Sequence, residues 1–251
     1  AIPPRAQIAE AEIWDGSPAR KTGTVDLAAL PPQAEAGPGR RAAMTAFCVL
    51  MLVVVPPISL LPIFPAFWLF DQIDDWISSW SEISYLWYLP LLTWPTAIGL
   101  ISFTVFLMAG LRWAILPRVT SGSYSIHSGF YARKWTVSLA TEVTLETLSS
   151  LFATIYMRAW YRLMGARIGS GAEISTNLSG RFDLTAIGAG NFIADEVVFG
   201  DEDMRRGYMR LDMTRTGEQV FVGNDAVVPP GAVIPDRVLI GIKSKPPAND
   251  R

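Results

Sequence analysis

The stretch FVGNDAVVPPGAVIPDRVLIGIKS, residues 221–244, carries an aliphatic side chain at every sixth position. A small or turn-forming residue follows each of them, so the pairs are Val222–Gly223, Val228–Pro229, Ile234–Pro235 and Ile240–Gly241. This period matches neither the 3.6-residue turn of a helix nor the two-residue alternation of a strand. It is typical of the hexapeptide repeats of a parallel β-helix, whose coils stack to bury their inner faces. Chance spacing in a chain rich in Ile and Val is the alternative explanation.

The same period recurs in two other stretches. One contains Ile168, Ile174, Ile187, Ile193 and Phe199, and the other contains Ile2, Ile8 and Trp14. The intervals 174–187 and 199–222 are out of step, so each is expected to hold a loop. We predict the closing coil of a first β-helix domain over residues 1–23, a Pro- and Gly-rich linker over 24–41, a second β-helix domain over 166–247 and a truncated tail over 248–251.

Composition indicates a membrane protein. The chain has 251 residues, of which 50% are hydrophobic and 18% charged, and its mean hydropathy is +0.28. Residues 42–70 and 83–111 contain no charged residue, and each run exceeds the roughly 20 residues that span a bilayer. We predict two transmembrane helices there, joined by an acidic external loop over 71–82, with a buried core helix as the alternative for each. Pro56, Pro57, Pro62 and Pro65 predict that the first helix is kinked or interrupted.

The flanking charges predict the orientation. Arg40 and Arg41 precede the first run and Arg112 and Arg118 follow the second, whereas the connection between them is acidic. The positive-inside rule then gives a multi-pass protein of the inner (cytoplasmic) membrane, with the lipid bilayer as a partner and the soluble domains on the cytoplasmic side. The sequence contains no basic patch with interleaved aromatic residues, so a nucleic-acid partner is not expected. A single cysteine, Cys48, excludes a disulfide framework.

Residues 112–165 are predicted to form juxtamembrane amphipathic helices. Trp135, Leu139 and Val143 begin an apolar stripe that would lie in the membrane interface. The expected fold class is therefore mixed: a left-handed parallel β-helix of hexapeptide repeats, a transmembrane helical hairpin and an interfacial amphipathic helix.

A few polar residues could carry chemistry. His127 is the only histidine, and imidazole is the usual general base near neutral pH; the alternative is an interfacial His bonded to a backbone carbonyl. Asp183, Asp195 and Asn224 lie near the corners of the predicted coils, where turn residues that cap the local backbone are the alternative. The sequence holds no metal-ligand cluster, Gly-rich phosphate loop or Ser nucleophile elbow.

Four segments resemble a known family. They are SIHSGFYARKW, MGARIGSGAEIST, DLTAIGAGNFIADEVVFGDEDMRRGYM and FVGNDAVVPPGAVIPDRVLIGIKSKPP. They are similar to the membrane-embedded C-terminal region of nonribosomal peptide synthetases of the ε-poly-lysine-synthetase type, in which hexapeptide-repeat domains alternate with transmembrane helix pairs. The resemblance implies iterative amide-bond formation from carrier-bound aminoacyl thioesters and an amine acceptor. The partners would be adenylation and carrier domains of the same polypeptide. The phosphopantetheine cofactor would sit on the carrier, so this segment would hold no cofactor and would not be active alone.

The resemblance also implies roles for individual residues. The family's pattern has its histidine at His127, its aspartate at Asp183, FIAD at Phe192–Asp195 and GN at Gly223–Asn224. His127 would act as the general base on the attacking ammonium, Asp183 would orient it, and Asn224 would donate a hydrogen bond to the oxyanion.

Other functions stay open at this point. The segment could be a non-catalytic scaffold or an export conduit of the same synthetase, or a membrane-anchored hexapeptide acyltransferase that uses coenzyme A. A homo-oligomer is a further option, since the sequence gives neither the oligomeric state nor the amino acid used.

Overall fold

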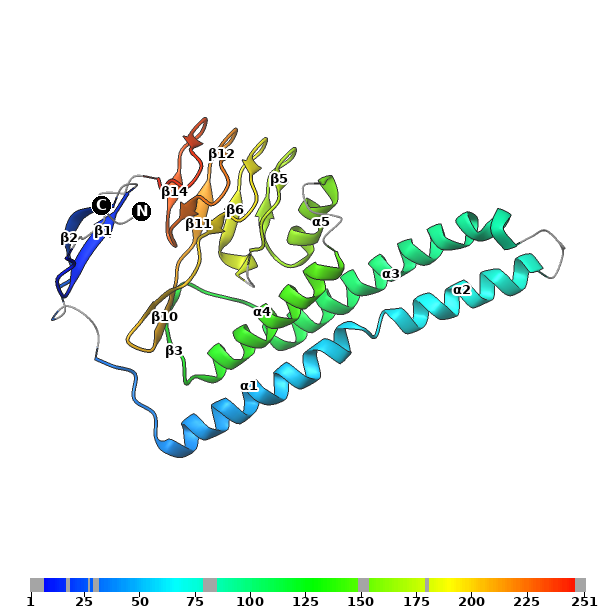
Figure 1. The fold of residues 1–251 in the computed structure, drawn as a ribbon, viewed down its shortest axis with the longest axis horizontal. Coiled ribbons are helices and arrows are strands. Elements are labelled where there is room, and N and C mark those ends of the chain that lie inside the picture. Colours follow the sequence, from blue (N-terminus) through cyan, green and yellow to red (C-terminus); the bar gives the residue numbers. More distant parts are fainter. Residues whose placement is uncertain are drawn as a thin grey trace.

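A computed structural model describes residues 7–16, 19–26, 28, 32–78, 85–148, 154–178 and 181–246. It has a bundle of long helices and, above one end of that bundle, a stack of short parallel strands (Figure 1). The predictions that concern Ile2, residues 79–82 and the tail over 248–251 lie outside the described residues.

Three helices make the long arm of the bundle. They are α1 (Pro38–Ser59), α2 (Ile63–Ser78) and α3 (Tyr85–Ile115). The chain leaves helical geometry between α1 and α2, because Pro62 has no N–H to offer the carbonyl of Ile58. That carbonyl instead accepts from the N–H of Leu61 at 3.1 Å. The break falls inside the run that the prolines predict to be interrupted, while Pro56 and Pro57 remain within α1.

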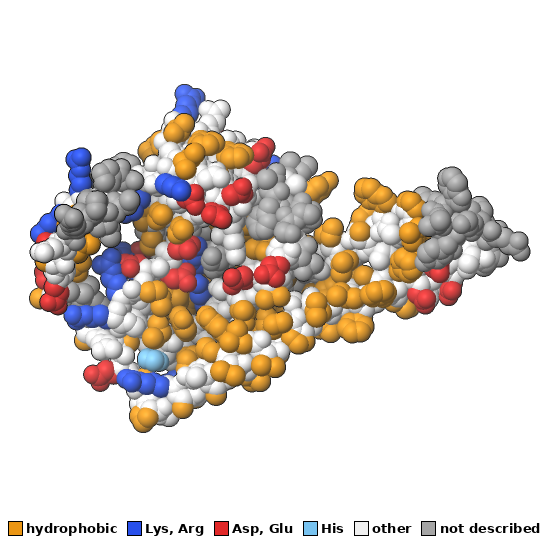
Figure 2. Space-filling model, viewed as in Figure 1, with side chains coloured by type: hydrophobic (Ala, Val, Ile, Leu, Met, Phe, Trp, Pro, Cys, Tyr) orange, Lys and Arg blue, Asp and Glu red, His pale blue; other side chains and the backbone are white. Residues whose placement is uncertain are grey.

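Two segments are long and apolar enough to cross a membrane. They are Pro38–Ser78, which includes the break, and Leu92–Ile115. Large apolar side chains project from both, with Phe64, Trp94 and Phe106 between 68% and 70% exposed, and apolar atoms cover the arm in Figure 2. Continuous apolar surface on this scale is unusual for a protein surrounded by water. These helices therefore indicate that the chain associates with a membrane.

The acidic stretch differs from its prediction. Asp71, Asp74 and Asp75, expected in an external loop, lie in the last turns of α2. Their charge suggested a loop, but neither Gly nor Pro interrupts residues 66–78, so the helix continues through them.

Helix α4 (Gly129–Thr147) lies between the bundle and the strand stack. Ser128 caps its N-terminus by accepting from the N–H of Tyr131 at 3.1 Å, and the helix contacts α1 and α3. The stripe predicted to face the membrane interface, Trp135, Leu139 and Val143, is only half-buried. The fully buried positions are instead Lys134, Thr136, Val137, Ala140, Thr141, Thr144 and Leu145. Helix α4, expected to lie in the membrane interface, is thus packed against other elements on more than one side. A single apolar stripe in the sequence does not predict this packing.

Helix α5 (Ile155–Leu163) closes the base of the stack. Thr154 caps it by accepting from the N–H of Tyr156 at 3.3 Å, and the helix contacts the first two strands of the stack. Tyr161 is fully buried and donates to the carbonyl of Thr176, and burial raises the pKa of its hydroxyl. Gly165 follows with φ of +111°, which glycine adopts at no steric cost.

The stack consists of three parallel sheets. Their strand orders are β14–β11–β6–β4, β15–β12–β7–β5 and β13–β8. The chain visits the sheets in the same order on successive passes, first through β6, β7 and β8 and then through β11, β12 and β13. The strands are β4 (Arg167–Ile168), β5 (Glu173–Ile174), β6 (Thr185–Ile187), β7 (Phe192–Ile193), β8 (Val198–Phe199), β11 (Thr214–Thr216), β12 (Phe221–Val222), β13 (Val227–Val228), β14 (Val233–Ile234) and β15 (Leu239–Ile240).

The repeat governs burial in this stack. The side chains at the repeated positions are at most 5% exposed; they are Ile168, Ile174, Ile187, Ile193, Phe199, Val222, Val228, Ile234 and Ile240. The residue before each points outward, as Phe192, Phe221 and Leu239 do at 37%, 40% and 73% exposure. The corners between strands are tight: a Cβ on Gly188 would come within 2.5 Å of the backbone of Gly217 in the next pass. Successive passes therefore share one continuous apolar core.

An antiparallel hairpin interrupts the stack. Strands β9 (Asp203–Arg205) and β10 (Tyr208–Leu211) leave it after β8, and β10 also pairs with β3 (Gly122–Ser125) in the connection between α3 and α4. This excursion occupies the interval in which the repeat is out of step, and it joins the stack to the helical bundle.

The N-terminal stretch pairs differently from the stack. Strands β1 (Glu12–Asp15) and β2 (Arg20–Thr24) form a two-stranded antiparallel sheet, whereas a coil of the predicted kind pairs its strands in parallel. The predicted closing coil over residues 1–23 lies partly outside the described residues and stays a prediction.

Candidate functional site

Four charged side chains meet where α4 faces the stack. The Nζ of Lys134 lies 2.6 Å from Oε1 of Glu202. Arg181 forms an ion pair with Asp201, and its Nε lies 3.4 Å from Oε2 of Glu202. The side chains of Lys134 and Arg181 are only 4% and 3% exposed, whereas those of Glu202 and Asp201 are 27% and 44% exposed. This charged cluster thus has an enclosed basic side and an acidic side that reaches solvent.

Local geometry fixes the acidic side. Asp201 and Glu202 directly follow β8, where Gly200 has φ of +67° and packs against the side chain of Thr214. Only glycine fits there without strain, because any Cβ would overlap Thr214. Arg181 also donates to the carbonyl of Phe199 at 3.1 Å. The turn out of the stack therefore carries both carboxylates to the same place beside α4.

Burial and neighbouring charges shift the pKa values of the cluster. Burial lowers the pKa of Lys134 and of Arg181, and the facing carboxylates oppose that change. Burial raises the pKa of Asp201, with Arg181 opposing. Burial alone would also raise the pKa of Glu202, but Lys134 and Arg181 together bring it below its ordinary value. Glu202 is the carboxylate that contacts both enclosed cations, while Asp201 also stabilises Arg181.

A groove opens next to the charged cluster. It has a volume of about 430 Å³, and Asp201, Glu202 and Asp203 lie along it. The outer faces of Val198, Val227 and two prolines give it an apolar floor. Arg205 and Arg210 also line it, but each is ion-paired at 2.8 Å, with Asp203 and Asp212 respectively. Carboxylates beside an apolar floor suit a ligand that combines an ammonium group with a short methylene chain.

His127 lies in the turn between β3 and α4. Its backbone N–H donates to Oγ of Ser125 at 3.1 Å, and its backbone carbonyl accepts from Nε of Arg40 at 2.8 Å. The preceding N–H, of Ile126, donates to the carbonyl of Gly207 at the tip of the β9–β10 hairpin. Among the described residues the imidazole itself has no hydrogen-bond partner and does not line the groove, and it is visible at the surface (Figure 2).

Asp183 binds a different partner from the one predicted. Its Oδ2 forms an ion pair with Arg112 of α3 and accepts from the N–H of Val119 at 2.9 Å. Arg112 is 1% exposed and also donates to the carbonyls of Leu116 and Pro117, both at 2.9 Å. The carboxylate therefore fastens the end of α3 to the base of the stack. Within the described part of the chain, no contact joins it to His127, so an orienting role for it gains no support.

Asp195 and Asn224 come together, apart from the other candidates. The pairing of Ile193 with Val222 puts them at the same corner of successive passes. Both side chains are exposed. The carbonyl of Asp195 accepts from the N–H of Asp225 at 3.2 Å, and that of Asn224 accepts from the N–H of Lys243 at 2.9 Å. In the described chain the predicted residues thus fall into separate places, and no hydrogen bond links either of these two to His127.

Sequence reasoning missed the charged cluster. The sequence does not single out Lys134, and Asp201 and Glu202 fall within the interval 199–222 that is expected to hold a loop. The available signal was the acidic triplet Asp201–Asp203 at the point where the six-residue period is lost. In the described residues, no group of three or more His, Cys, Asp or Glu side chains could hold a metal ion.

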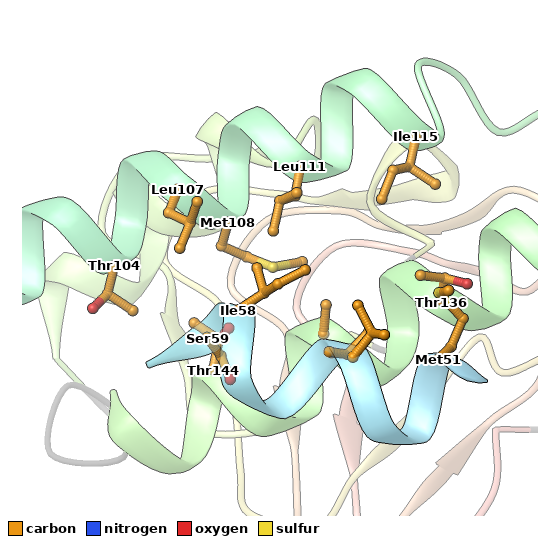
Figure 3. A pocket seen from close by; sticks show the side chains of 13 residues that line it. Met51, Ile58, Ser59, Thr104, Leu107, Met108, Leu111, Ile115, Thr136 and Thr144 are labelled. Carbon is orange, nitrogen blue, oxygen red and sulfur yellow. The ribbon is translucent and has the colours of Figure 1, made fainter. Parts of the chain in front are cut away.

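A second cavity is structural. About 80 Å³ is enclosed between α1, α3 and α4, with mainly aliphatic side chains around it (Figure 3). Its hydroxyls bond to their own helices: Thr104 donates to the carbonyl of Leu100 at 2.7 Å, and Thr136 to that of Ala132 at 2.9 Å. Such a lining offers little to a polar substrate.

The chain is similar to a curated synthetase. It is 37% identical over 246 residues to delta-poly-L-ornithine synthetase from Acinetobacter baumannii (strain AB307-0294). The match covers 96% of this chain but 18% of that protein, so the chain spans less than a fifth of the relative's length. No protein family model matches the chain. No solved structure matches it either.

Proposed function

We propose that this chain is a membrane-associated part of a synthetase that builds a poly-amino acid by forming amide bonds. The similarity to delta-poly-L-ornithine synthetase carries the proposal, because it extends over 96% of the chain. Activation of the monomer would then belong to adenylation and carrier domains outside this segment. The product would be a polymer of a diamino acid such as ornithine.

The architecture we propose follows from the repeat. The strand stack would be a left-handed parallel β-helix, which is supported by its parallel pairing and by the burial of every repeated position. The helices would form a multi-pass anchor in the inner membrane. The stack would lie on the cytoplasmic side, since basic residues flank the apolar segments at the end nearest to it.

The groove beside the charged cluster would hold the cationic substrate. Asp203, whose present partner is Arg205, would face the ammonium group, and the apolar floor would accept the methylenes of the side chain. The enclosed cations Lys134 and Arg181 lower the pKa of Glu202, which would keep that carboxylate ionised near neutral pH.

The chemical step would be aminolysis of a thioester. The free amine of one substrate attacks the carbonyl carbon of an aminoacyl group delivered by a carrier. The C–N bond forms, the C–S bond breaks, and the thiol leaves with one proton. The family resemblance would make His127 the acceptor of the proton that the attacking ammonium releases, and this role would require the amine to leave the groove, which His127 does not line.

Binding to the groove can be tested by one charge change. Asp203→Asn should weaken binding of a short ornithine oligomer about fivefold, because an exposed ion pair contributes about 1 kcal/mol. Glu173→Gln is the matched control, since Glu173 is an exposed carboxylate of β5 outside the groove. Calorimetric titration at low and high salt measures both. Equal losses in the two variants, or no loss in either, would count against the groove as the amine site.

Catalysis can be tested separately in the complete synthetase. His127→Ala should slow polymer formation by a factor of about 10² to 10⁴, the usual contribution of a general base, while ATP–pyrophosphate exchange is unchanged. Unchanged polymer formation would favour a scaffold or an export conduit. Consumption of an acyl coenzyme A by the wild-type protein would favour a coenzyme A-dependent acyltransferase.

A further inference from the structure

A basic groove lies on the outer face of one sheet of the stack. The sheet is the one whose strands run in the order β14–β11–β6–β4. The groove has a volume of about 420 Å³, and Arg162, Arg167, Ala186 and Gly188 lie along it. Among the described residues, no Asp or Glu lines it. It is therefore separate from the acidic groove and carries the opposite charge.

Strand register brings two arginines to this face. Arg167 of β4 pairs with Ala186 of β6, and Ala186 pairs with Arg215 of β11. Adjacent strands lie about 4.8 Å apart, which puts the two arginine Cα atoms about 10 Å apart. Only the methyl side chain of Ala186 points outward between them. Both guanidinium groups can therefore reach one group that binds over Ala186.

These arginines have no counter-charge. Arg167 and Arg215 are exposed, and within the described part of the chain their side chains have no hydrogen bond or ion pair. The arginines of the acidic groove differ, because each is paired with a neighbouring aspartate. Arg162 is held in place by Nε and Nη2, which both donate to the carbonyl of Ile168. Its Nη1 donors remain available in the described chain.

The arginines distinguish this sheet from the other two. The outward residues of the remaining sheets are Glu173, Phe192, Phe221 and Leu239 in one and Val198 and Val227 in the other. None of these is basic. Asp212, which precedes β11, is already paired with Arg210 at 2.8 Å. Planar guanidinium groups bind phosphate through paired N–H donors, so this face suits a phosphate ester.

We propose that this face binds the phosphodiester of the arm that brings the aminoacyl thioester. The inference rests on the proposed function, in which a phosphopantetheine arm carries the acyl group and the acidic groove holds the free amine. The acidic groove repels a phosphate, whereas Arg167 and Arg215 attract it. Two substrates of opposite charge thus bind on different sheets of one stack. The arginines bind and orient the arm, and no bond or proton changes at them.

Binding can be measured apart from catalysis. The complete synthetase, with a carrier that lacks its own arm, is placed in phosphatidylcholine nanodiscs and titrated calorimetrically with 4′-phosphopantetheine or with pantetheine, which lacks the phosphate. Wild-type protein should bind the phosphorylated compound about tenfold more tightly, at about threefold for each exposed contact, and by less at high salt. Arg167→Gln/Arg215→Gln should remove most of this difference. Arg20→Gln/Arg118→Gln should keep it, because both of these exposed arginines lie outside the groove lining.

The synthetase with its arm in place identifies the source of the phosphate. Polymer formation should slow in Arg167→Gln/Arg215→Gln while ATP–pyrophosphate exchange is unchanged, and free 4′-phosphopantetheine should inhibit the wild type but not this variant. Equal binding of the two compounds by the wild type, or equal losses in the two double variants, would overturn the site. Turnover that requires added acyl coenzyme A would overturn the carrier as the source. Arginine-dependent binding without polymer formation by the wild type would refute the proposed function alone.

Discussion

Removing the charge of Glu202 should destabilise the protein by about 3 kcal/mol. The Nζ of Lys134 lies 2.6 Å from its Oε1, which gives a gross attraction of about 6 kcal/mol at an effective dielectric constant of about 20. Losing one partner of a buried pair costs about 3–5 kcal/mol, because the other charge remains enclosed. Glu202 is 27% exposed and glutamine keeps one acceptor oxygen, so Glu202→Gln should fall at the low end of that range.

Thermal unfolding in detergent measures this cost. The nine tryptophans of the chain give a fluorescence signal, and a loss of about 3 kcal/mol predicts a Tm lower by about 6–12 °C in a protein of this size. The exposed control Glu173→Gln should change Tm little. The double variant Lys134→Met/Glu202→Gln should recover much of the loss, because Lys134 no longer remains enclosed without a partner and Arg181 keeps Asp201. A Tm of Glu202→Gln within 2 °C of wild type, or a double variant no better than the single one, would refute the reasoning.

The same pair predicts a dependence on pH. The pKa of Glu202 in the folded protein lies below its ordinary value of 4.5, so its ionisation stabilises the fold above that value. This stabilisation is lost as the pH falls through the lowered pKa. The raised pKa of Asp201 acts in the opposite direction, and Glu202→Gln should reduce that rise because the charge of Glu202 contributes to it. The difference in Tm between the two proteins should therefore shrink below about pH 4.5.

Four further substitutions test the core and the contact between α3 and the stack. Asp183→Asn should cost about 3 kcal/mol, because Arg112 is 1% exposed and loses its counter-charge; an unchanged melting curve would contradict the ion pair. Ile193→Ala, at a fully buried position, should cost about 2–5 kcal/mol in urea unfolding, whereas Leu239→Ala, at a 73% exposed position, should cost far less. Gly188→Ala should destabilise by more than about 1 kcal/mol, because its Cβ would overlap the backbone of the next pass; a Tm equal to wild type would show that this corner is looser than described.

Much of the fold follows from local patterns. The burial of Val222 and Ile234 could be predicted, because the six-residue period is visible in a short stretch of sequence. The apolar helices could be predicted as well, because residues 42–70 and 83–111 contain no charged residue. The pairing of β10 with β3 could not be predicted in this way, because Leu211 and its partner Gly122 are far apart in the chain. The direction and partner of such a strand depend on tertiary packing.

The candidate site was harder to predict for the same reason. Lys134 resembles a flanking cation on its own, and its role depends on Glu202, which lies 68 positions away. Asp183 resembles a corner residue, yet its partner Arg112 lies 71 positions away. His127 could be singled out because it is the only histidine, but residue type says nothing about which groups surround the imidazole. Long-range ion pairs between common residue types leave no periodic trace in the sequence.

The double attachment of the stack has a mechanical consequence. The β3–β10 pairing and the bond from Asp183 to Arg112 connect it to the helices at separate points, so it cannot swivel about a single joint. A carrier domain that delivers the aminoacyl group must therefore itself move to the stack, which stays fixed relative to the helices. The reach of its tether then limits delivery, and for a flexible segment that reach grows only as about 5–6 Å times the square root of its residue number. Shortening such a tether should slow turnover without altering the stationary part.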